Sequence, residues 1–108
     1  MSLLVVEVIH PNLLRLWGVC REPSHIAIVT EFMSEGSMEE VLKRIRDGDR
    51  DPLMELERLS ILKQCALGLQ ALHNRNIIHR DLSARNILLT TNMRAVISNS
   101  LCEYRKRE

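Results

Sequence analysis

The segment His79-Arg80-Asp81-Leu82-Ser83-Ala84-Arg85-Asn86 carries the residue types best suited to chemistry in this chain of 108 residues. It holds a carboxylate, two guanidinium groups and an amide, and the apolar pairs Ile77-Ile78 and Ile87-Leu88 bound it. A carboxylate can accept a proton, and carboxylate and amide oxygens can bind a divalent cation. An Asp and an Asn in a loop are also common turn residues that cap the backbone. The surrounding elements must therefore distinguish a catalytic loop from an ordinary turn.

The first third of the chain predicts strands. Residues 13–20 alternate enough for one strand, and residues 25–32 are apolar and β-branched, which predicts a strand buried on both faces. Residues 21–24 form a turn, so we expect the two strands to pair antiparallel. Residues 1–8 fit either the end of a helix or a buried strand, and His10-Pro11 interrupts them.

Two helices are predicted next. Ser37 followed by Glu40 is a capping box that begins a helix from Met38 to about Ile45. Asp51-Pro52 is a second helix start, with Asp as N-cap and Pro at the first helical position. Apolar residues then recur at helical spacing to about His73: Leu59, Leu62, Ala66, Leu69 and Leu72.

Gly68 and the segment after the long helix complete the predicted elements. Gly68 costs roughly 1 kcal/mol relative to Ala inside a helix, so its presence indicates close packing. Residues 87–89 and 95–97 are predicted as two short strands around a turn at residues 90–92.

This order of elements resembles the middle of a protein kinase domain, from His10 to about Leu101. Residues 10–20 (HPNLLRLWGVC) resemble the approach to the fourth strand of that family, and residues 29–38 (VTEFMSEGSM) resemble the hinge of cytoplasmic tyrosine kinases. Residues 79–86 resemble the catalytic loop. Ser83 stands where Ser/Thr kinases usually carry Lys, which favours the tyrosine-kinase or tyrosine-kinase-like branch.

The resemblance implies an α+β, partial protein-kinase-like fold. Residues 1–33 would form the end of the N-lobe and the hinge, and residues 34–104 the start of the C-lobe with the catalytic loop. Residues 105–108 would be a tail.

The resemblance also implies a role for several residues of the catalytic loop. Asp81 would orient and deprotonate a substrate hydroxyl, and Arg85 would hold the substrate side of that site. Asn86 would ligate one magnesium ion. His79 would be a packing residue rather than a base.

An ATP site is implied at the hinge. Thr30 would guard the pocket behind the nucleotide, and backbone groups of Glu31 and Met33 would hydrogen-bond adenine. Gly36 would also belong to the cofactor-binding residues, and Leu88 would form the pocket floor.

The family pattern fails after the catalytic loop. Kinases carry Asp-Phe-Gly thirteen residues after the magnesium-binding Asn, and that count from Asn86 reaches Asn99-Ser100-Leu101. Asn99 is a degenerate metal position, because it offers an oxygen without negative charge and magnesium favours carboxylates. No glycine-rich loop or Val-Ala-Ile-Lys strand precedes His10, and no activation loop follows Glu108. We therefore expect weak or absent ATP and magnesium binding.

Three interpretations of function follow from this mixture. The chain is a truncated, inactive, pseudokinase-like domain, or a fragment of a longer tyrosine kinase that transfers the ATP γ-phosphate to protein tyrosine. A kinase-derived binding module without nucleotide is the third. Each implies a protein substrate or protein partner and leaves the oligomeric state open.

Composition limits location and partners. The formal net charge of +1 gives no field that would attract nucleic acid, and no apolar run approaches the length of a membrane span. The three cysteines are far apart and lack metal-site spacing, which favours a reduced, cytoplasmic protein.

Overall fold

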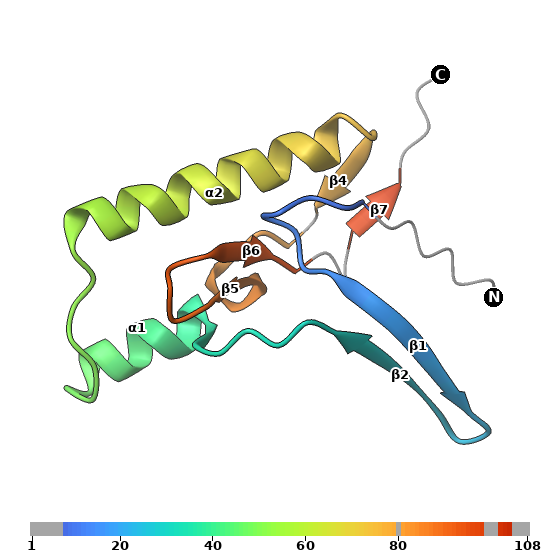
Figure 1. The fold of residues 1–108 in the computed structure, drawn as a ribbon, viewed down its shortest axis with the longest axis horizontal. Helices are drawn as coiled ribbons and strands as arrows, with labels where there is room; N and C mark the ends of the chain where they lie inside the picture. Colours follow the sequence, from blue (N-terminus) through green and yellow to red (C-terminus); the bar gives the residue numbers. More distant parts are fainter. Residues whose placement is uncertain (1–7, 80, 99–101, 105–108) are drawn as a thin grey trace.

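The computed structural model describes residues 8–79, 81–98 and 102–104. The predictions for residues 1–7, for Asn99-Ser100-Leu101 and for the tail at 105–108 lie outside the described residues. In the described part, a hairpin of two strands projects from a body of two helices and short strands (Figure 1). The predicted α+β class is confirmed. Neither described helix has the length and apolar composition needed to cross a bilayer.

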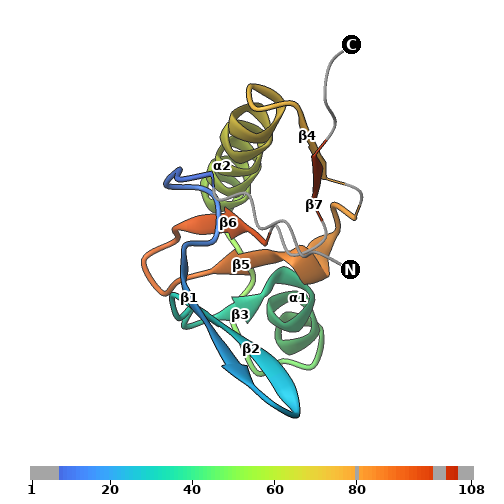
Figure 2. The ribbon, with the colours of Figure 1, turned by 90° about the vertical axis from the view of Figure 1, so that its right-hand side faces the viewer.

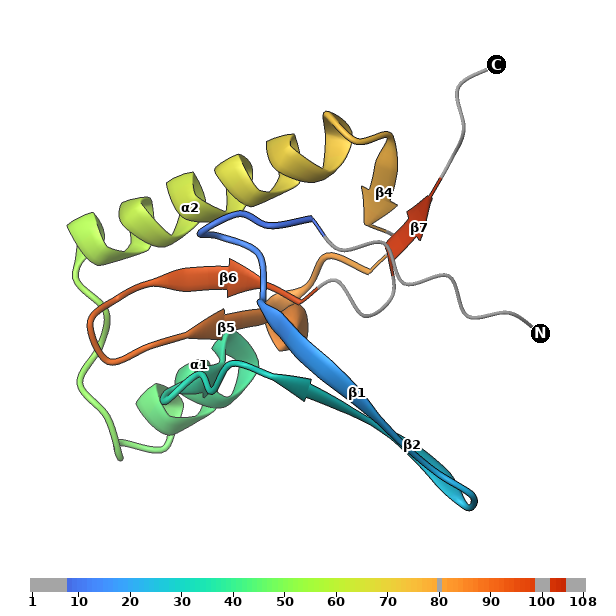
Figure 3. The same ribbon diagram turned by 45° about the vertical axis from the view of Figure 1, so that its right-hand side comes forward.

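The hairpin consists of β1 (Leu16–Glu22) and β2 (His25–Thr30), which pair antiparallel as predicted. Figure 3 shows it standing away from the body. The predicted burial of β2 on both faces is wrong, because the residues from His25 to Val29 are exposed and Thr30 is half-buried. β-Branched composition suits a covered strand, but burial depends on a neighbour, and no other described element packs extensively on this hairpin.

The body is built around a three-stranded antiparallel sheet. Its order is β3 (Gly36–Ser37), β5 (Ile87–Leu89), β6 (Ala95–Ile97). The two strands predicted at residues 87–89 and 95–97 are confirmed. β4 (Ile77–His79) pairs separately with β7 (Cys102–Tyr104), and the 3-10 helix η1 (Ala84–Asn86) precedes β5.

Helices α1 (Met38–Arg46) and α2 (Glu55–His73) cover this sheet. Figure 2 shows them on opposite sides of it, and α2 packs against β6 while α1 packs against β3 and β5. The Ser37 side chain accepts a hydrogen bond from the Glu40 amide at 3.2 Å, which confirms that half of the predicted capping box.

The predicted start of the long helix at Asp51-Pro52 is wrong. Leu53 is buried before the helix begins, and Met54, whose backbone is extended, is the N-cap of a helix that begins at Glu55. The Met54 amide donates to Glu57 Oε1 at 2.8 Å, so the cap comes from a glutamate inside the first turn. The predicted end at His73 is confirmed.

The predicted apolar stripe of α2 is only partly correct. Leu59, Leu62 and Ala66 are exposed, and Leu69 is half-buried. The residues that α2 buries are Ile61, Cys65, Gly68 and Leu72. Because apolar residues occur around most of α2, spacing alone could not identify the covered face.

Gly68 lies where α2 meets the backbone of the segment before β1. A Cβ added at Gly68 would lie 2.7 Å from the Asn12 carbonyl oxygen and 3.3 Å from Ile97 Cδ1. This confirms the close packing inferred from its place in a helix.

Replacing Gly68 with alanine should therefore destabilise the protein. The added methyl group meets backbone, and such overpacking costs about 1–3 kcal/mol. Helix propensity returns about 1 kcal/mol. We expect a net loss of up to about 2 kcal/mol in the free energy of unfolding, measured by urea denaturation.

Gly18→Ala is the matched control for this change. The space around Gly18 is open to 4 Å, so its replacement should change stability by less than about 0.5 kcal/mol. A more stable Gly68→Ala protein would contradict the close contact.

Candidate functional site

The structure brings the three predicted catalytic-loop residues together. An Arg85 guanidinium nitrogen donates to Asp81 Oδ2. Asn86 Nδ2 donates to the Asp81 carbonyl oxygen at 2.7 Å and to Asp81 Oδ2 at 3.1 Å. Arg85 and Asn86 belong to η1, which turns the chain so that both side chains reach back to Asp81.

His79 holds the other side of this loop. Its Nε2 lies 2.7 Å from the Ser98 carbonyl oxygen, and its Nδ1 accepts from the Asp81 amide at 3.1 Å. A carbonyl oxygen only accepts hydrogen bonds, so Nε2 is the donor in the contact with Ser98. With both ring nitrogens engaged, His79 links β4 to the end of β6, in line with the packing role that the resemblance implies.

Charge is concentrated at the pair formed by Asp81 and Arg85. The hydrogen bond from Arg85 lowers the pKa of the Asp81 carboxyl, and the same contact raises the pKa of Arg85. Asp81 is therefore ionised at neutral pH. An ionised carboxylate can accept a hydrogen bond from a hydroxyl group, although Arg85 already occupies one of its oxygens.

Asn86 offers a magnesium ion one ligand. Its Nδ2 is engaged by Asp81, and no described residue donates to its side-chain oxygen. An amide oxygen suits magnesium, but a charged site normally adds carboxylates. The described residues contain no group of three or more His, Cys, Asp or Glu side chains placed to hold a metal. Asn86 thus fits a single ligand rather than a complete site.

The hinge joins β2 to β3 and is tied to β5. The Glu35 amide donates to the Leu89 carbonyl at 2.9 Å, and Ser37 pairs with Leu88. Leu88, the predicted pocket floor, therefore lies beside β3, the strand that follows the hinge. Gly36 adopts a φ of 74°, a conformation that glycine takes without strain.

The backbone groups predicted to face adenine are only partly available. The Glu31 carbonyl accepts from the Thr30 hydroxyl at 3.2 Å, and the Met33 carbonyl accepts from the Gly36 amide at 3.0 Å. The Met33 amide has no acceptor among the described residues. An open depression of about 550 Å³ includes Met33 and Gly36 but not Thr30 or Leu88, so it follows the α1 side of the hinge.

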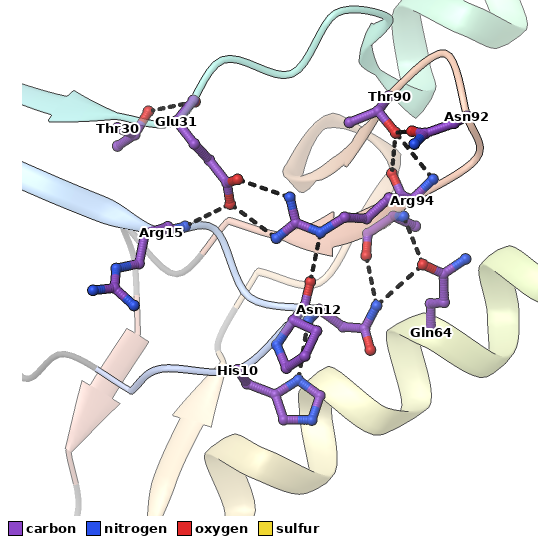
Figure 4. Close-up of polar contacts among 11 residues, drawn as sticks. His10, Asn12, Arg15, Thr30, Glu31, Gln64, Thr90, Asn92 and Arg94 are labelled. Atoms are coloured by element: carbon purple, nitrogen blue, oxygen red, sulfur yellow. Dashed lines mark hydrogen bonds and ion pairs between the residues drawn. The ribbon is translucent and has the colours of Figure 1, made fainter.

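The Glu31 side chain makes contacts that the motifs did not predict (Figure 4). Its Oε1 accepts from the Arg15 amide at 2.9 Å and from Arg94 at 3.1 Å, and its Oε2 accepts from Arg94 at 2.7 Å. Arg94 Nε also donates to the Pro11 carbonyl at 2.9 Å. The hydrogen bonds from Arg94 are the main reason that the pKa of Glu31 is lowered.

A second polar cluster, centred on Asn12 and Gln64, adjoins this ion pair (Figure 4). Asn12 Nδ2 donates to Gln64 Oε1 at 3.1 Å and to the Ala95 carbonyl at 3.0 Å. Gln64 Oε1 also accepts from the Ala95 amide at 2.8 Å. No motif contains Gln64 or Arg94, and nothing in their spacing could have identified them.

Known proteins provide an independent comparison. Residues 2–105 match a family model described as protein tyrosine and serine/threonine kinase. Ephrin type-A receptor 3 of Danio rerio is 40% identical over 90 residues, which cover 83% of this chain and 9% of that protein. The tyrosine-protein kinase Abl of Drosophila melanogaster is 43% identical over 86 residues, which cover 80% of this chain and 5% of that protein. The serine/threonine-protein kinase CTR1 of Arabidopsis thaliana is 42% identical over 82 residues, which cover 74% of this chain and 10% of that protein. The chain spans a tenth or less of the length of these relatives.

Proposed function

Because the chain belongs to the protein tyrosine and serine/threonine kinase family, we propose that it is a partial, catalytically inactive, pseudokinase-like domain of the tyrosine-kinase branch. Its relatives include tyrosine kinases and serine/threonine kinases. The observation that carries the proposal is Asn99-Ser100-Leu101 in place of Asp-Phe-Gly.

The loss of one carboxylate has a specific chemical consequence. Phosphoryl transfer depends on positioning and on neutralising the charge of the phosphates, which magnesium ions supply when bound. Asn86 contributes a neutral oxygen, Asn99 would add only another neutral oxygen, and Arg85 occupies an oxygen of Asp81. Asn86 and Asn99 thus lack the negative charge that a magnesium ion favours, and the charge of Asp81 is already paired with Arg85.

The catalytic loop would then keep a reduced role. Asp81 would accept a hydrogen bond from a tyrosine hydroxyl, and Arg85 would hold the substrate side. Thr30, Glu31, Met33, Gly36 and Leu88 would form a nucleotide site that binds ATP weakly or not at all. The partner would be a protein, and the free thiols of Cys20 and Cys65 fit a cytoplasmic location.

Phosphoryl transfer by the purified chain tests this proposal. With Mg-ATP and a tyrosine-containing polypeptide, we expect phosphate incorporation no higher than that of the Asp81→Asn variant. An active tyrosine kinase in the same buffer is the positive control. Incorporation by the chain that Asp81→Asn abolishes would overturn the proposed inactivity. An increase in Tm of several degrees with Mg-ATP would contradict weak nucleotide binding.

A fragment of an active tyrosine kinase is the second candidate, and the complete set of contacts among Asp81, Arg85 and Asn86 favours it. Sequencing the full transcript separates the two. An upstream exon that encodes a glycine-rich loop would support the fragment, and its absence would count against it.

A further inference from the structure

We propose that Glu31 and Arg94 form an ionic latch that fixes the hinge and the β1–β2 hairpin onto the β5–β6 turn without any nucleotide. This goes beyond the proposed function, which concerns nucleotide and phosphoryl transfer, because the latch is built from this chain's own side chains. Arg94 is then a positioning residue for the hinge.

The attachment of the hairpin explains why a latch matters. The hairpin joins the body only through the segments before β1 and after β2, and neither strand packs extensively on another described element (Figure 3). On the β1 side, the Leu14 amide donates to the Ile97 carbonyl at 3.0 Å. On the β2 side, the Glu31 side chain makes the first connection after the strand. Further along the hinge, the Ser34 hydroxyl accepts from the Thr91 amide at 3.0 Å, and the Glu35 amide donates to the Leu89 carbonyl at 2.9 Å. The direction of the hairpin therefore depends on a small number of contacts at its base.

One guanidinium group ties these segments together. Arg94 donates to both carboxylate oxygens of Glu31 and, through Nε, to the Pro11 carbonyl. The Arg15 amide completes three N–H donors on the Glu31 carboxylate. A bidentate guanidinium–carboxylate pair has a fixed geometry, which a lysine could not reproduce.

Burial separates this pair from ordinary surface ion pairs. The side chains of Glu31 and Arg94 are 17% and 36% exposed, whereas those of Arg46 and Asp47 are 73% and 47% exposed. Exposed pairs are screened by solvent and contribute little. The lowered pKa of Glu31, caused chiefly by Arg94, agrees with a pair that interacts strongly.

Hydrogen exchange in the absence of nucleotide tests the latch. In Arg94→Met and Glu31→Gln, we expect the Glu31 and Leu14 amides to exchange about tenfold faster, because local opening becomes easier. The Leu72 amide in the α2 core should keep its rate. Arg94→Lys should give an intermediate exchange rate at Glu31, since one ammonium group cannot replace the bidentate contact of the guanidinium group.

The matched control is Arg46→Met, which removes the exposed pair with Asp47 and should change none of these rates. The double variant Glu31→Arg with Arg94→Glu should restore part of the protection that each single change removes. Unchanged exchange at Leu14 in Arg94→Met would overturn the latch, because the Leu14 amide donates to Ile97 of β6, whereas the Glu31 amide donates to Arg15 at the base of the hairpin. Equal acceleration at Glu31 and Leu72 would also overturn it, because the loss would then be global.

A pH series adds a measurement that simple packing would not affect. Among the described residues, the charged groups that act on Glu31 are Arg94 and Arg15. Gln64 of α2 contacts Asn12 and Ala95 rather than Glu31, and His10 lies beyond Asn12 (Figure 4). Because the pKa of Glu31 is lowered from about 4.5, its stabilising effect is present above that value and is lost as pH falls through the folded-state pKa. The difference in the free energy of unfolding between the unmodified chain and Glu31→Gln should therefore become smaller as the pH falls. An advantage independent of pH would overturn the ionic latch.

None of these measurements contains nucleotide. Phosphoryl transfer by the chain would therefore contradict the proposed inactivity and leave the latch intact, whereas unchanged hinge exchange would remove the latch and leave the proposed inactivity intact.

Discussion

Replacing Ile97 with alanine is expected to lower the free energy of unfolding by about 2–5 kcal/mol. Ile97 on β6 is fully buried, and its Cδ1 lies against Gly68 of α2. Its backbone also bridges to Leu13, so the side chain fills the space where α2, β6 and the segment before β1 meet. Truncation leaves a cavity there, because the surrounding backbone is held by hydrogen bonds and can relax only partly. Small domains have a total stability of about 5–15 kcal/mol, so this one change removes a large share.

Urea denaturation of two single variants, Ile97→Ala and Ile26→Ala, checks the prediction. Ile26 on β2 is 60% exposed, so the same truncation there should change stability by less than about 0.5 kcal/mol. If both variants lost equal stability, the hairpin would have to be covered in solution, and its exposed position in the structure would be contradicted.

Elements with signals confined to a few residues were predictable from the sequence. The strands at residues 87–89 and 95–97 follow from apolar, β-branched runs on either side of a polar turn, and both were placed correctly. The start of α1 follows from Ser37, whose side chain caps a backbone amide three residues later. Each of these signals is local, so it acts whatever the rest of the chain does.

Elements whose burial depends on distant partners could not be predicted in the same way. Apolar residues of α2 itself occur around most of its circumference. The face that is covered is the one that packs against β6 and, at Gly68, against the Asn12 backbone. The apolar run of β2 predicted a covered strand, yet composition cannot supply the covering element. The helix α2 begins at Glu55 rather than after Asp51-Pro52: Leu53 is buried before it, and Glu57 caps the Met54 amide.

In the candidate site too, contacts within one motif were predictable and contacts with distant residues were not. Asp81, Arg85 and Asn86 lie in one short motif, so the sequence was sufficient to bring them together. The hinge residues also came from a motif, but the side chain of Glu31 binds a residue 63 positions away. Spacing along the chain carries no signal for such a pair, because either residue alone has the appearance of an ordinary surface charge. The roles of the site residues stay predictions, and Asn99 lies outside the described residues.

Replacing Asn12 with aspartate is the second change with a large expected effect. Asn12 is buried, and its side-chain nitrogen donates to Gln64 Oε1 and to the Ala95 carbonyl. The change keeps the shape of the side chain but replaces this double donor by an oxygen that faces two acceptors. A buried charge without a partner typically costs about 3–5 kcal/mol, and we expect a loss of this size at neutral pH.

The loss should depend on pH in a defined direction. Burial and the two facing acceptors disfavour the ionised form, so the pKa of the introduced carboxyl should be raised in the folded state. The destabilisation is then complete above the folded-state pKa and decreases as pH falls through it, because the protonated carboxyl can donate to one acceptor. The difference in unfolding free energy between the variant and the unmodified chain, measured in urea from neutral to acidic pH, should therefore narrow.

Asn92→Asp is the matched control for this prediction. Asn92 is exposed in the β5–β6 turn, and its side-chain oxygen accepts from the Thr90 hydroxyl at 2.5 Å. An aspartate can accept the same hydrogen bond, so this change should cost less than about 0.5 kcal/mol at neutral pH. If Asn12→Asp were equally mild, the buried amide would not be joining α2 to β6. A loss that stayed constant with pH would instead point to altered packing, because only an ionisable group explains the narrowing.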